Sequence, residues 1–125
     1  MERVRGIGGV FFKSKDPKAL ARWYQEHLGV EVEDWGGGSF KWALHDLRGT
    51  ASTVWSPFAA DTSYFAPSTA SFMINYRVDD LDAMLAQLRA AGVQVDDKVE
   101  DSEFGRFGWA FDCDGNKLEL WQPPT

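Results

Sequence analysis

The sequence predicts an α+β protein built from two tandem modules, each with the order strand, helix, strand, strand, strand. A strand that runs into an aspartate before a helix occurs twice, at 7–16 and again at 71–80. An aspartate turn followed by a short strand that ends in tryptophan also occurs twice, at 46–55 and 112–121. Because equivalent positions of a duplicated unit occupy equivalent places, this repeat indicates which residues should face one shared space.

The first module opens with a strand in which Val10 and Phe12 alternate with residues of the opposite face. Asp16 fits a helix N-cap and Pro17 the first helical position, where its missing N–H needs no partner. Gly29 ends the helix. The helix has an apolar stripe at Leu20, Trp23, Tyr24 and Leu28. Strands are expected after it at 30–34, 40–44 and 53–55.

The second module repeats the pattern. Asp80 is the expected N-cap and Gly92 the stop of its helix. The apolar stripe of this helix consists of Leu81, Met84, Leu85 and Leu88. Strands are expected at 93–95, 107–111 and 117–121, with a tight turn at 114–116. We expect a single domain over 1–125, with modules at about 5–57 and 70–123 and a connector at about 58–69.

Composition and charge exclude several classes of partner. A chain of 125 residues with 44% apolar residues can bury one core. Its net charge of -6 argues against nucleic acid and anionic membrane surfaces, which favour basic proteins. The sequence has no apolar run of the ~18 residues that a membrane helix needs and no signal-like N-terminus. Since the single cysteine, Cys113, cannot form an intrachain disulfide, we expect a cytoplasmic protein.

The two modules, with aspartates at their strand-to-helix junctions, resemble the vicinal oxygen chelate superfamily. This group includes glyoxalase I, bleomycin-resistance proteins and extradiol dioxygenases. The most specific resemblance is the segment 112–121, in which Cys113 replaces the proline that is usual in the family's Asp-Pro-Asp-Gly-Asn turn. The resemblance implies two open, curved sheets that face each other around a cavity, with the helices outside. Because functions in this family differ widely, the fold does not settle the activity.

The family's enzymes hold a divalent metal on the first and last strands of each module, which the resemblance places at Gly9, Thr53, Met73 and Glu119. Gly9 has no side chain, Met73 offers a soft thioether and Thr53 is a weak neutral donor. A catalytic metal normally needs about three protein ligands. We therefore expect no metal site and no other cofactor.

Two interpretations of His45 stay open. It aligns with Phe111 of the second module, so alternation places it on the cavity face near the mouth, where it would contact a ligand. Alternatively, it is a solvated side chain beside a turn.

Alternation along the strands predicts which side chains face the shared space. The inward set is Phe11, Thr53, Trp55, Met73, Asn75, Phe107, Trp109, Glu119 and Trp121. The opposite faces, including Val10, Val54 and Leu120, should pack under the helices. Aromatic rings with a few polar groups are typical of a small-molecule site. The same rings could instead fill the space as core, and the sequence does not decide between a pocket and a core.

Glu119 is the residue most suited to chemistry. A carboxylate among Trp109, Trp121 and Met73 would be desolvated, which raises its pKa and suits a general acid or base. The alternative is an ion pair with a base such as Arg106 or Lys41.

Two classes of function follow. The first is metal-independent binding of a small apolar or aromatic molecule in the cavity, by a homodimer. The second is a glyoxalase-like lyase or isomerase with Glu119 as base, with or without an atypical metal. A structural dimer without a ligand is a third possibility, and whether the protein is an enzyme stays undecided at this stage.

Overall fold

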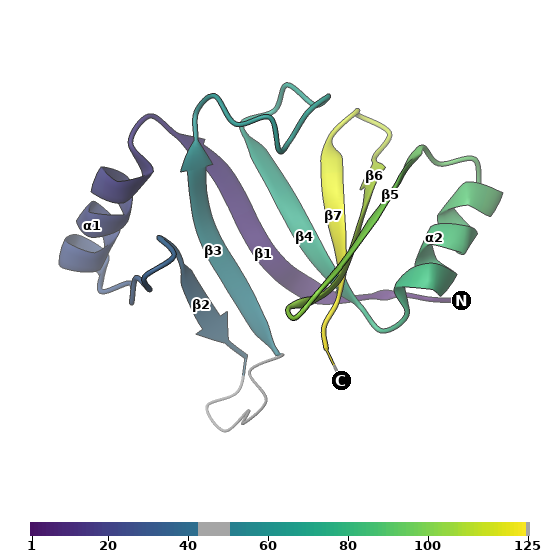
Figure 1. Cartoon of the computed structure of the whole chain (residues 1–125), viewed down its shortest axis with the longest axis horizontal. Helices are drawn as coiled ribbons and strands as arrows, with labels where there is room; N and C mark the ends of the chain where they lie inside the picture. The colour runs from purple at the N-terminus through teal and green to yellow at the C-terminus, as the bar shows by residue number, and fades with distance from the viewer. Residues whose placement is uncertain (43–50, 125) are drawn as a thin grey trace.

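The computed structural model describes residues 1–42 and 51–124. Within these ranges two helices accompany one mixed sheet of seven strands, in the order β2-β3-β1-β4-β7-β6-β5. The elements are β1 (Val4–Ser14), α1 (Pro17–Leu28), β2 (Gly38–Lys41), β3 (Ser52–Ala59), β4 (Phe72–Val78), α2 (Leu81–Ala90), β5 (Val95–Ser102), β6 (Gly105–Phe111) and β7 (Lys117–Gln122). Figure 1 shows the sheet as an open, curved surface, with α1 and α2 near its opposite ends.

Both helices begin at the predicted aspartates. The Asp16 carboxylate accepts a hydrogen bond from the Ala19 N–H at 3.1 Å, and Asp80 accepts one from the Ala83 N–H at 3.1 Å. Each bond satisfies one of the backbone donors that the first turn of a helix leaves without a partner. Gly29, with a φ of 69°, ends α1 in the left-handed region that favours glycine.

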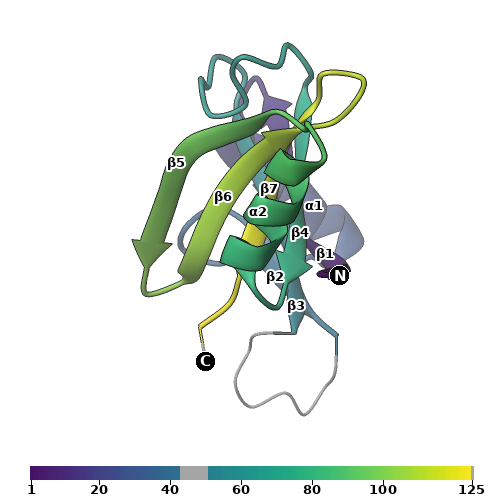
Figure 2. The same cartoon turned by 90° about the vertical axis from the view of Figure 1, so that its right-hand side faces the viewer.

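The two modules join edge to edge within the chain. β1 runs antiparallel to β4 at the centre of the sheet, while β3 and β7 flank this pair, each parallel to its neighbour. The α+β fold of βαβββ modules is thereby confirmed, and the two predicted sheets form one continuous surface. Seen from the side in Figure 2, β5 and β6 stand away from the β1–β3 region, so the sheet has a concave face.

The strand predicted at 30–34 is wrong. The backbone here folds into a turn, in which the Glu33 N–H donates to the Gly37 carbonyl at 2.8 Å and the Gly36 N–H donates to the Glu33 carbonyl at 2.9 Å. A backbone closed on itself in this way cannot pair with a neighbouring strand. The turn carries Trp35 to the mouth of the concave face.

Two apolar clusters lie on opposite sides of the sheet. One joins α2 to the sheet and contains Val78, Leu81, Met84, Leu85 and Leu120. The other lies on the concave side and contains Phe11, Phe65, Met73 and Trp109. Phe65 belongs to the connector between the modules and is fully buried. The connector therefore closes part of the concave side, while the rest stays open.

Candidate functional site

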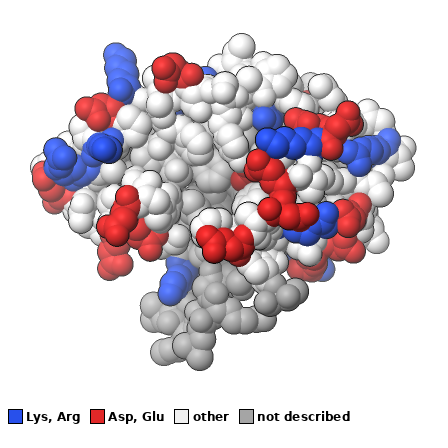
Figure 3. Space-filling view, viewed as in Figure 1, with Lys and Arg blue, Asp and Glu red and all other residues white. Residues whose placement is uncertain are grey.

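The concave face holds a cavity of about 610 Å³, large enough for a small organic molecule. Its wall is mostly apolar and aromatic and comes from both modules. The lining residues are Gly8, Phe11, Trp35, Ser39, Ser52, Val54, Asn75, Glu103, Phe104, Phe107, Trp121 and Pro124. In Figure 3 the hollowed middle of this face is uncharged, and acidic and basic side chains gather around it.

Four of the side chains expected to face inward line this cavity: Phe11, Asn75, Phe107 and Trp121. The Phe107 and Trp121 rings stack with an interplanar angle of 9° and centroids 6.3 Å apart. The Trp121 indole N–H donates to the Phe104 carbonyl at 2.8 Å. This hydrogen bond fixes the indole plane, so the wall offers a flat aromatic surface of defined orientation.

Two other inward residues belong to the packed cluster rather than to the cavity wall. Met73 is fully buried and Trp109 is 3% exposed, and both pack with Phe11 and Phe65. Pocket and core, the alternatives left open by the sequence, therefore occur side by side on the concave face.

The facing predicted for β3 is wrong, because its side chains point to the opposite sides of the sheet. Trp55 packs against Phe12 and Tyr24, on the side of the sheet covered by α1. The Thr53 hydroxyl donates to the Ile7 carbonyl at 2.6 Å and accepts from the Trp42 indole N–H at 2.9 Å, away from the cavity lining. Val54, expected under the helix, lines the cavity instead, together with Ser52.

The cause is the register of the parallel strand pairs. Phe11 lies opposite Ser56 in β1–β3, just as Asn75, its equivalent in the second module, lies opposite Glu119 in β4–β7. Ser56, and not Thr53, therefore corresponds to Glu119, and Val54 shares the face of Ser56. Matching Trp55 to Trp121 shifted the strand by an odd number of residues, and such a shift reverses the facing of every side chain.

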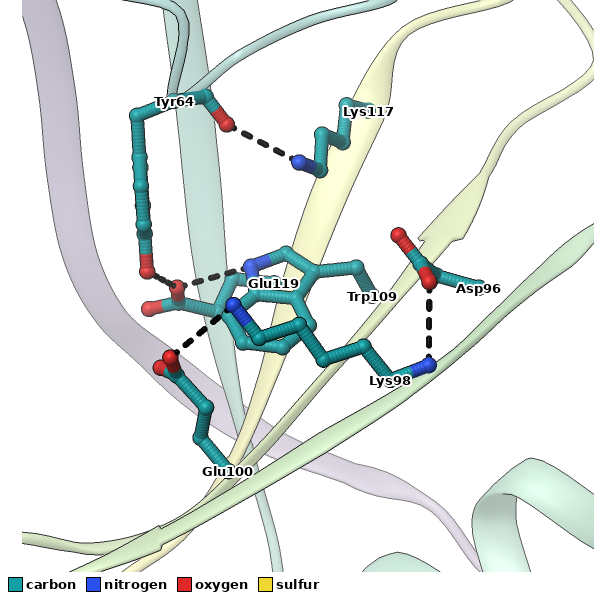
Figure 4. Close-up of polar contacts among 7 residues, drawn as sticks. All are labelled: Tyr64, Asp96, Lys98, Glu100, Trp109, Lys117 and Glu119. Atoms are coloured by element: carbon teal, nitrogen blue, oxygen red, sulfur yellow. Dashed lines mark hydrogen bonds and ion pairs between the residues drawn. The ribbon is translucent and has the colours of Figure 1, made fainter.

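Glu119 lies beneath the cavity wall and is 1% exposed. Its Oε2 accepts from the Tyr64 hydroxyl and from the Trp109 indole N–H, the latter at 2.9 Å, and its Oε1 accepts from Asn75 Nδ2 at 2.6 Å. Figure 4 shows Tyr64 and Trp109 converging on the carboxylate from two sides. Burial raises the pKa of Glu119 above its ordinary value, while the hydrogen bonds from Tyr64, Asn75 and Trp109 oppose that rise.

The ion pair between Glu119 and Arg106, the alternative that the sequence left open, does not form. Arg106 pairs instead with Asp82 at 3.0 Å and with Asp101 at 2.7 Å, on the protein surface. Glu119 is thus held by neutral hydrogen-bond donors.

Tyr64 is a site residue that sequence reasoning missed. It belongs to the connector, where no periodicity assigns a side chain to a face. Burial, together with the neighbouring Glu119 charge, raises its pKa. Lys117 donates to the Tyr64 carbonyl at 2.9 Å and lies 5.6 Å from the centre of its ring, as Figure 4 shows in part. The cluster of aromatic residues at 64–65 was the only signal in the connector that it packs into the fold.

The described residues of the concave face do not fit a divalent metal. Met73 and Thr53 lie in the core and on the opposite face, so the four positions implied by the family resemblance are not gathered. Both Glu119 oxygens already accept N–H or O–H donors. Across 1–42 and 51–124, no three His, Cys, Asp or Glu side chains are close enough to hold an ion. His45 lies outside the described residues, and its predicted role stays a prediction.

One curved sheet, built from the modules β1-α1-β2-β3 and β4-α2-β5-β6-β7 around a concave cavity, defines the class of protein. Residues 6–120 match the model of the Glyoxalase/Bleomycin resistance protein/Dioxygenase superfamily. The chain therefore belongs to this superfamily, whose fold is that of the vicinal oxygen chelate proteins.

Solved structures share this fold at low sequence identity. A methylmalonyl-CoA epimerase in complex with methylmalonyl-CoA and NH4+ has a TM-score of 0.74 and 17% identity, covering 98% of this chain and 97% of that chain. The methylmalonyl-CoA epimerase of Mycobacterium tuberculosis has a TM-score of 0.65 and 23% identity, covering 98% and 90%. A Legionella pneumophila protein described as an NAD-dependent benzaldehyde dehydrogenase has a TM-score of 0.62 and 15% identity, covering 93% and 98%. No curated protein matches the chain.

Proposed function

We propose that this protein binds a small, largely apolar molecule with a planar aromatic part in the concave cavity, and that binding needs no metal ion. The observation that carries this proposal is the cavity of about 610 Å³ walled by aromatic rings from both modules. Its fixed Trp121 and Phe107 faces suit stacking on a flat ligand. Four polar residues of the lining add the few polar groups that orient a ligand in such a site: Ser39, Ser52, Asn75 and Glu103.

Binding is favoured over catalysis because the carboxylate is set back from the cavity. Glu119 is not among the lining residues, and Asn75, which is, hydrogen-bonds to it. A substrate proton would therefore have to reach a base whose two oxygens already accept hydrogen bonds.

Two exposed tryptophans provide the test of binding. Trp35 lines the cavity mouth and is 53% exposed, whereas Trp23 is 51% exposed on α1 and lines no part of the cavity. Calorimetric titration with naphthalene should show saturable binding to the wild type. Trp35→Ala should weaken it by roughly three- to tenfold, the size of one lost aromatic contact, and Trp23→Ala should leave it unchanged. Equal effects of the two substitutions would contradict binding at this cavity.

Metal independence is tested by thermal melting of chelator-treated protein with nickel, zinc, manganese, cobalt and iron(II). An ion bound to the native state at a hundred times its dissociation constant stabilises it by about 2.7 kcal/mol, a shift easily seen in a melt. We expect no such shift. A saturable shift that disappears in Glu119→Gln would contradict metal independence.

A second candidate function, a lyase or isomerase reaction, rests on the buried carboxyl of Glu119 with its raised pKa. The structural relatives named methylmalonyl-CoA epimerase suggest methylmalonyl-CoA as the substrate to try. Exchange of its α-proton with deuterium would detect activity. In that case Glu119→Gln should lower the rate by roughly a hundredfold or more. The binding proposal expects no exchange above background.

We also propose that the protein acts as a homodimer in the cytoplasm. Large apolar side chains are exposed on the strands and on the segment after β2, among them Ile7, Phe40 and Trp42. No described helix is long and apolar enough to cross a membrane. Sedimentation velocity tests the dimer directly, and a single species with the mass of one chain at micromolar concentration would contradict it.

A further inference from the structure

Asn75, a residue of the cavity lining, has a buried side-chain oxygen without a hydrogen-bond partner among the described residues. The side chain is 2% exposed and lines the cavity, and no described protein group donates to its Oδ1 atom. The oxygen lies beside the wall formed by Gly8 and Trp121. A Cβ atom added to Gly8 would clash with Asn75 Oδ1 and come within 2.8 Å of the Trp121 ring. Buried acceptors in folded proteins nearly always accept a hydrogen bond, so we expect this oxygen to accept one from a bound molecule.

The orientation of the Asn75 amide is fixed by its hydrogen bond to Glu119. Asn75 Nδ2 donates to Glu119 Oε1 at 2.6 Å, a short hydrogen bond. When Glu119 is ionised, turning the amide would place Oδ1 against Oε1, and the two acceptors would repel each other. The nitrogen therefore faces Glu119, and the oxygen faces the cavity wall.

The orientation of Glu119 is fixed in turn by Trp109. An indole N–H only donates, so the carboxyl atom 2.9 Å from Trp109 Nε1 must be an acceptor. The Tyr64 hydroxyl donates to the same Oε2 atom. The polarity of the cavity wall thus depends on a chain of hydrogen bonds that starts at Trp109 and ends at Asn75.

We propose that Asn75 is the specificity-determining residue of the cavity, which selects planar ligands that carry an N–H or O–H donor, and that Glu119 is the positioning residue that sets this preference. The inference rests on the proposed binding function and names the chemical class of its ligand. The donor of the ligand bonds to Asn75 Oδ1 while its ring stacks on the Trp121 side of the cavity. A ligand that offers only an acceptor leaves the Asn75 oxygen unpaired and binds more weakly.

Replacing Glu119 by glutamine should invert the preference. Because Trp109 Nε1 only donates, the new amide must turn its oxygen toward Trp109 and its NH2 group toward Asn75. Asn75 then presents Oδ1 to that NH2 group and turns its own Nδ2 toward the cavity. The wall becomes a donor, although no residue that touches the ligand has changed.

Three bicyclic probes of similar size test this by calorimetry at neutral pH. Indole carries a donor, quinoline carries an acceptor, and naphthalene carries neither. In the wild type, indole should bind about tenfold more tightly than quinoline, with naphthalene between them, as expected for one hydrogen bond gained or left unmade. In Glu119→Gln, quinoline should become the tighter ligand. Glu100→Gln is the matched control, because Glu100 lies on β5, pairs with Lys98 and makes no hydrogen bond to Asn75 in the described structure. It should keep the wild-type order.

The outcomes test the role of Asn75, the role of Glu119 and the proposed binding function separately. Equal binding of the three probes to the wild type would overturn the role of Asn75 while leaving the cavity as a binding site. A wild-type preference for indole that persists in Glu119→Gln would overturn the role of Glu119. Binding of none of the probes would overturn the proposed function itself. If Glu119→Gln does not fold, the wild-type order and its loss in Asn75→Ser decide the selectivity.

Discussion

At the scale of the residue, Glu119 is subject to two opposing effects. Removal from water disfavours its charged form, while hydrogen bonds from Tyr64, Asn75 and Trp109 favour it. Desolvation is the larger effect, so the pKa of Glu119 is raised above its ordinary value of 4.5. A carboxyl of this kind ties the stability of the protein to pH.

The sign of the pH dependence follows from the raised pKa. The folded protein holds the Glu119 proton more tightly than the unfolded chain does, so this group stabilises the fold below pH 4.5, and the contribution is lost as pH rises through the raised pKa. We therefore compare the unfolding free energy of the wild type with that of Glu119→Gln. As pH rises through the raised pKa, the wild-type value minus the variant value should decrease by up to about 1.4 kcal/mol per pH unit. Urea unfolding of both proteins at a series of pH values measures this difference. A difference independent of pH would show that the pKa is not raised.

A second residue-scale prediction concerns Gly8. A methyl group here would meet Asn75 Oδ1 and the Trp121 ring, so Gly8→Ala should close the cavity beside the proposed acceptor. Naphthalene and indole should both bind more weakly, by roughly tenfold or more, because the bound ring loses its space. Calorimetry measures the loss, and a melting curve checks that the variant is folded. Unchanged affinity for both probes would place the ligand elsewhere.

The sequence predicted the facing of Asn75, Trp121 and Glu119 toward the concave side but not that of Tyr64, and the reason is physical. Residues on the strands of a module follow a period of two, so their faces follow from one another. Tyr64 lies in a connector, where only tertiary packing decides which way a side chain points. The amide orientation of Asn75 depends in the same way on Glu119, a partner 44 positions away.

At the scale of the element, the helices were predicted well because their signals are local. Asp16 and Asp80 each bond to a backbone N–H three residues ahead, so the start of a helix can be read from a few adjacent residues. The facing of β3 was predicted wrongly because alternation shows that neighbouring side chains point to opposite sides, but not which set points to the cavity. That choice is made by the pairing of β3 with β1, where Gly9 lies opposite Val54.

The caps give the first element-scale prediction. Asp16→Ala and Asp80→Ala should each lower the unfolding free energy by about 1 kcal/mol, because each leaves a helix N–H without its partner. Asp16→Asn and Asp80→Asn should keep nearly all of the stability, since an amide oxygen also caps a helix. Chemical denaturation measures both, and asparagine variants as unstable as the alanine variants would rule out capping as the cause.

The second prediction at the scale of the element concerns the connector between the modules. Phe65 is fully buried against the concave-side cluster, so Phe65→Ala should cost about 3–5 kcal/mol of stability. Phe104 is 67% exposed and serves as the control, since Phe104→Ala should change stability by less than about 0.5 kcal/mol. Similar losses in the two variants, measured by urea unfolding, would contradict the packing of the connector into the core.

At the scale of the whole molecule, joining the modules through β1 and β4 produces the cavity. The central pair of strands contributes Gly8, Phe11 and Asn75 to its floor, while the flanking strands and the turn between β5 and β6 supply the walls. Neither module alone would enclose this space. The family resemblance predicted curved sheets around a cavity, whereas the pairing of β1 with β4 within one chain and the identity of the lining residues came from the structure.

The central claim is that a planar molecule binds in this cavity, and side-chain NMR of the tryptophans tests it most directly. The six tryptophans of the chain give separate indole N–H signals. Trp35 and Trp121 line the cavity, whereas Trp23 and Trp55 lie at α1. On titration with indole, we predict saturable shifts of the Trp35 and Trp121 signals, with Trp23 and Trp55 unmoved. Saturable shifts confined to Trp23 and Trp55, or no shift in any signal, would contradict the account.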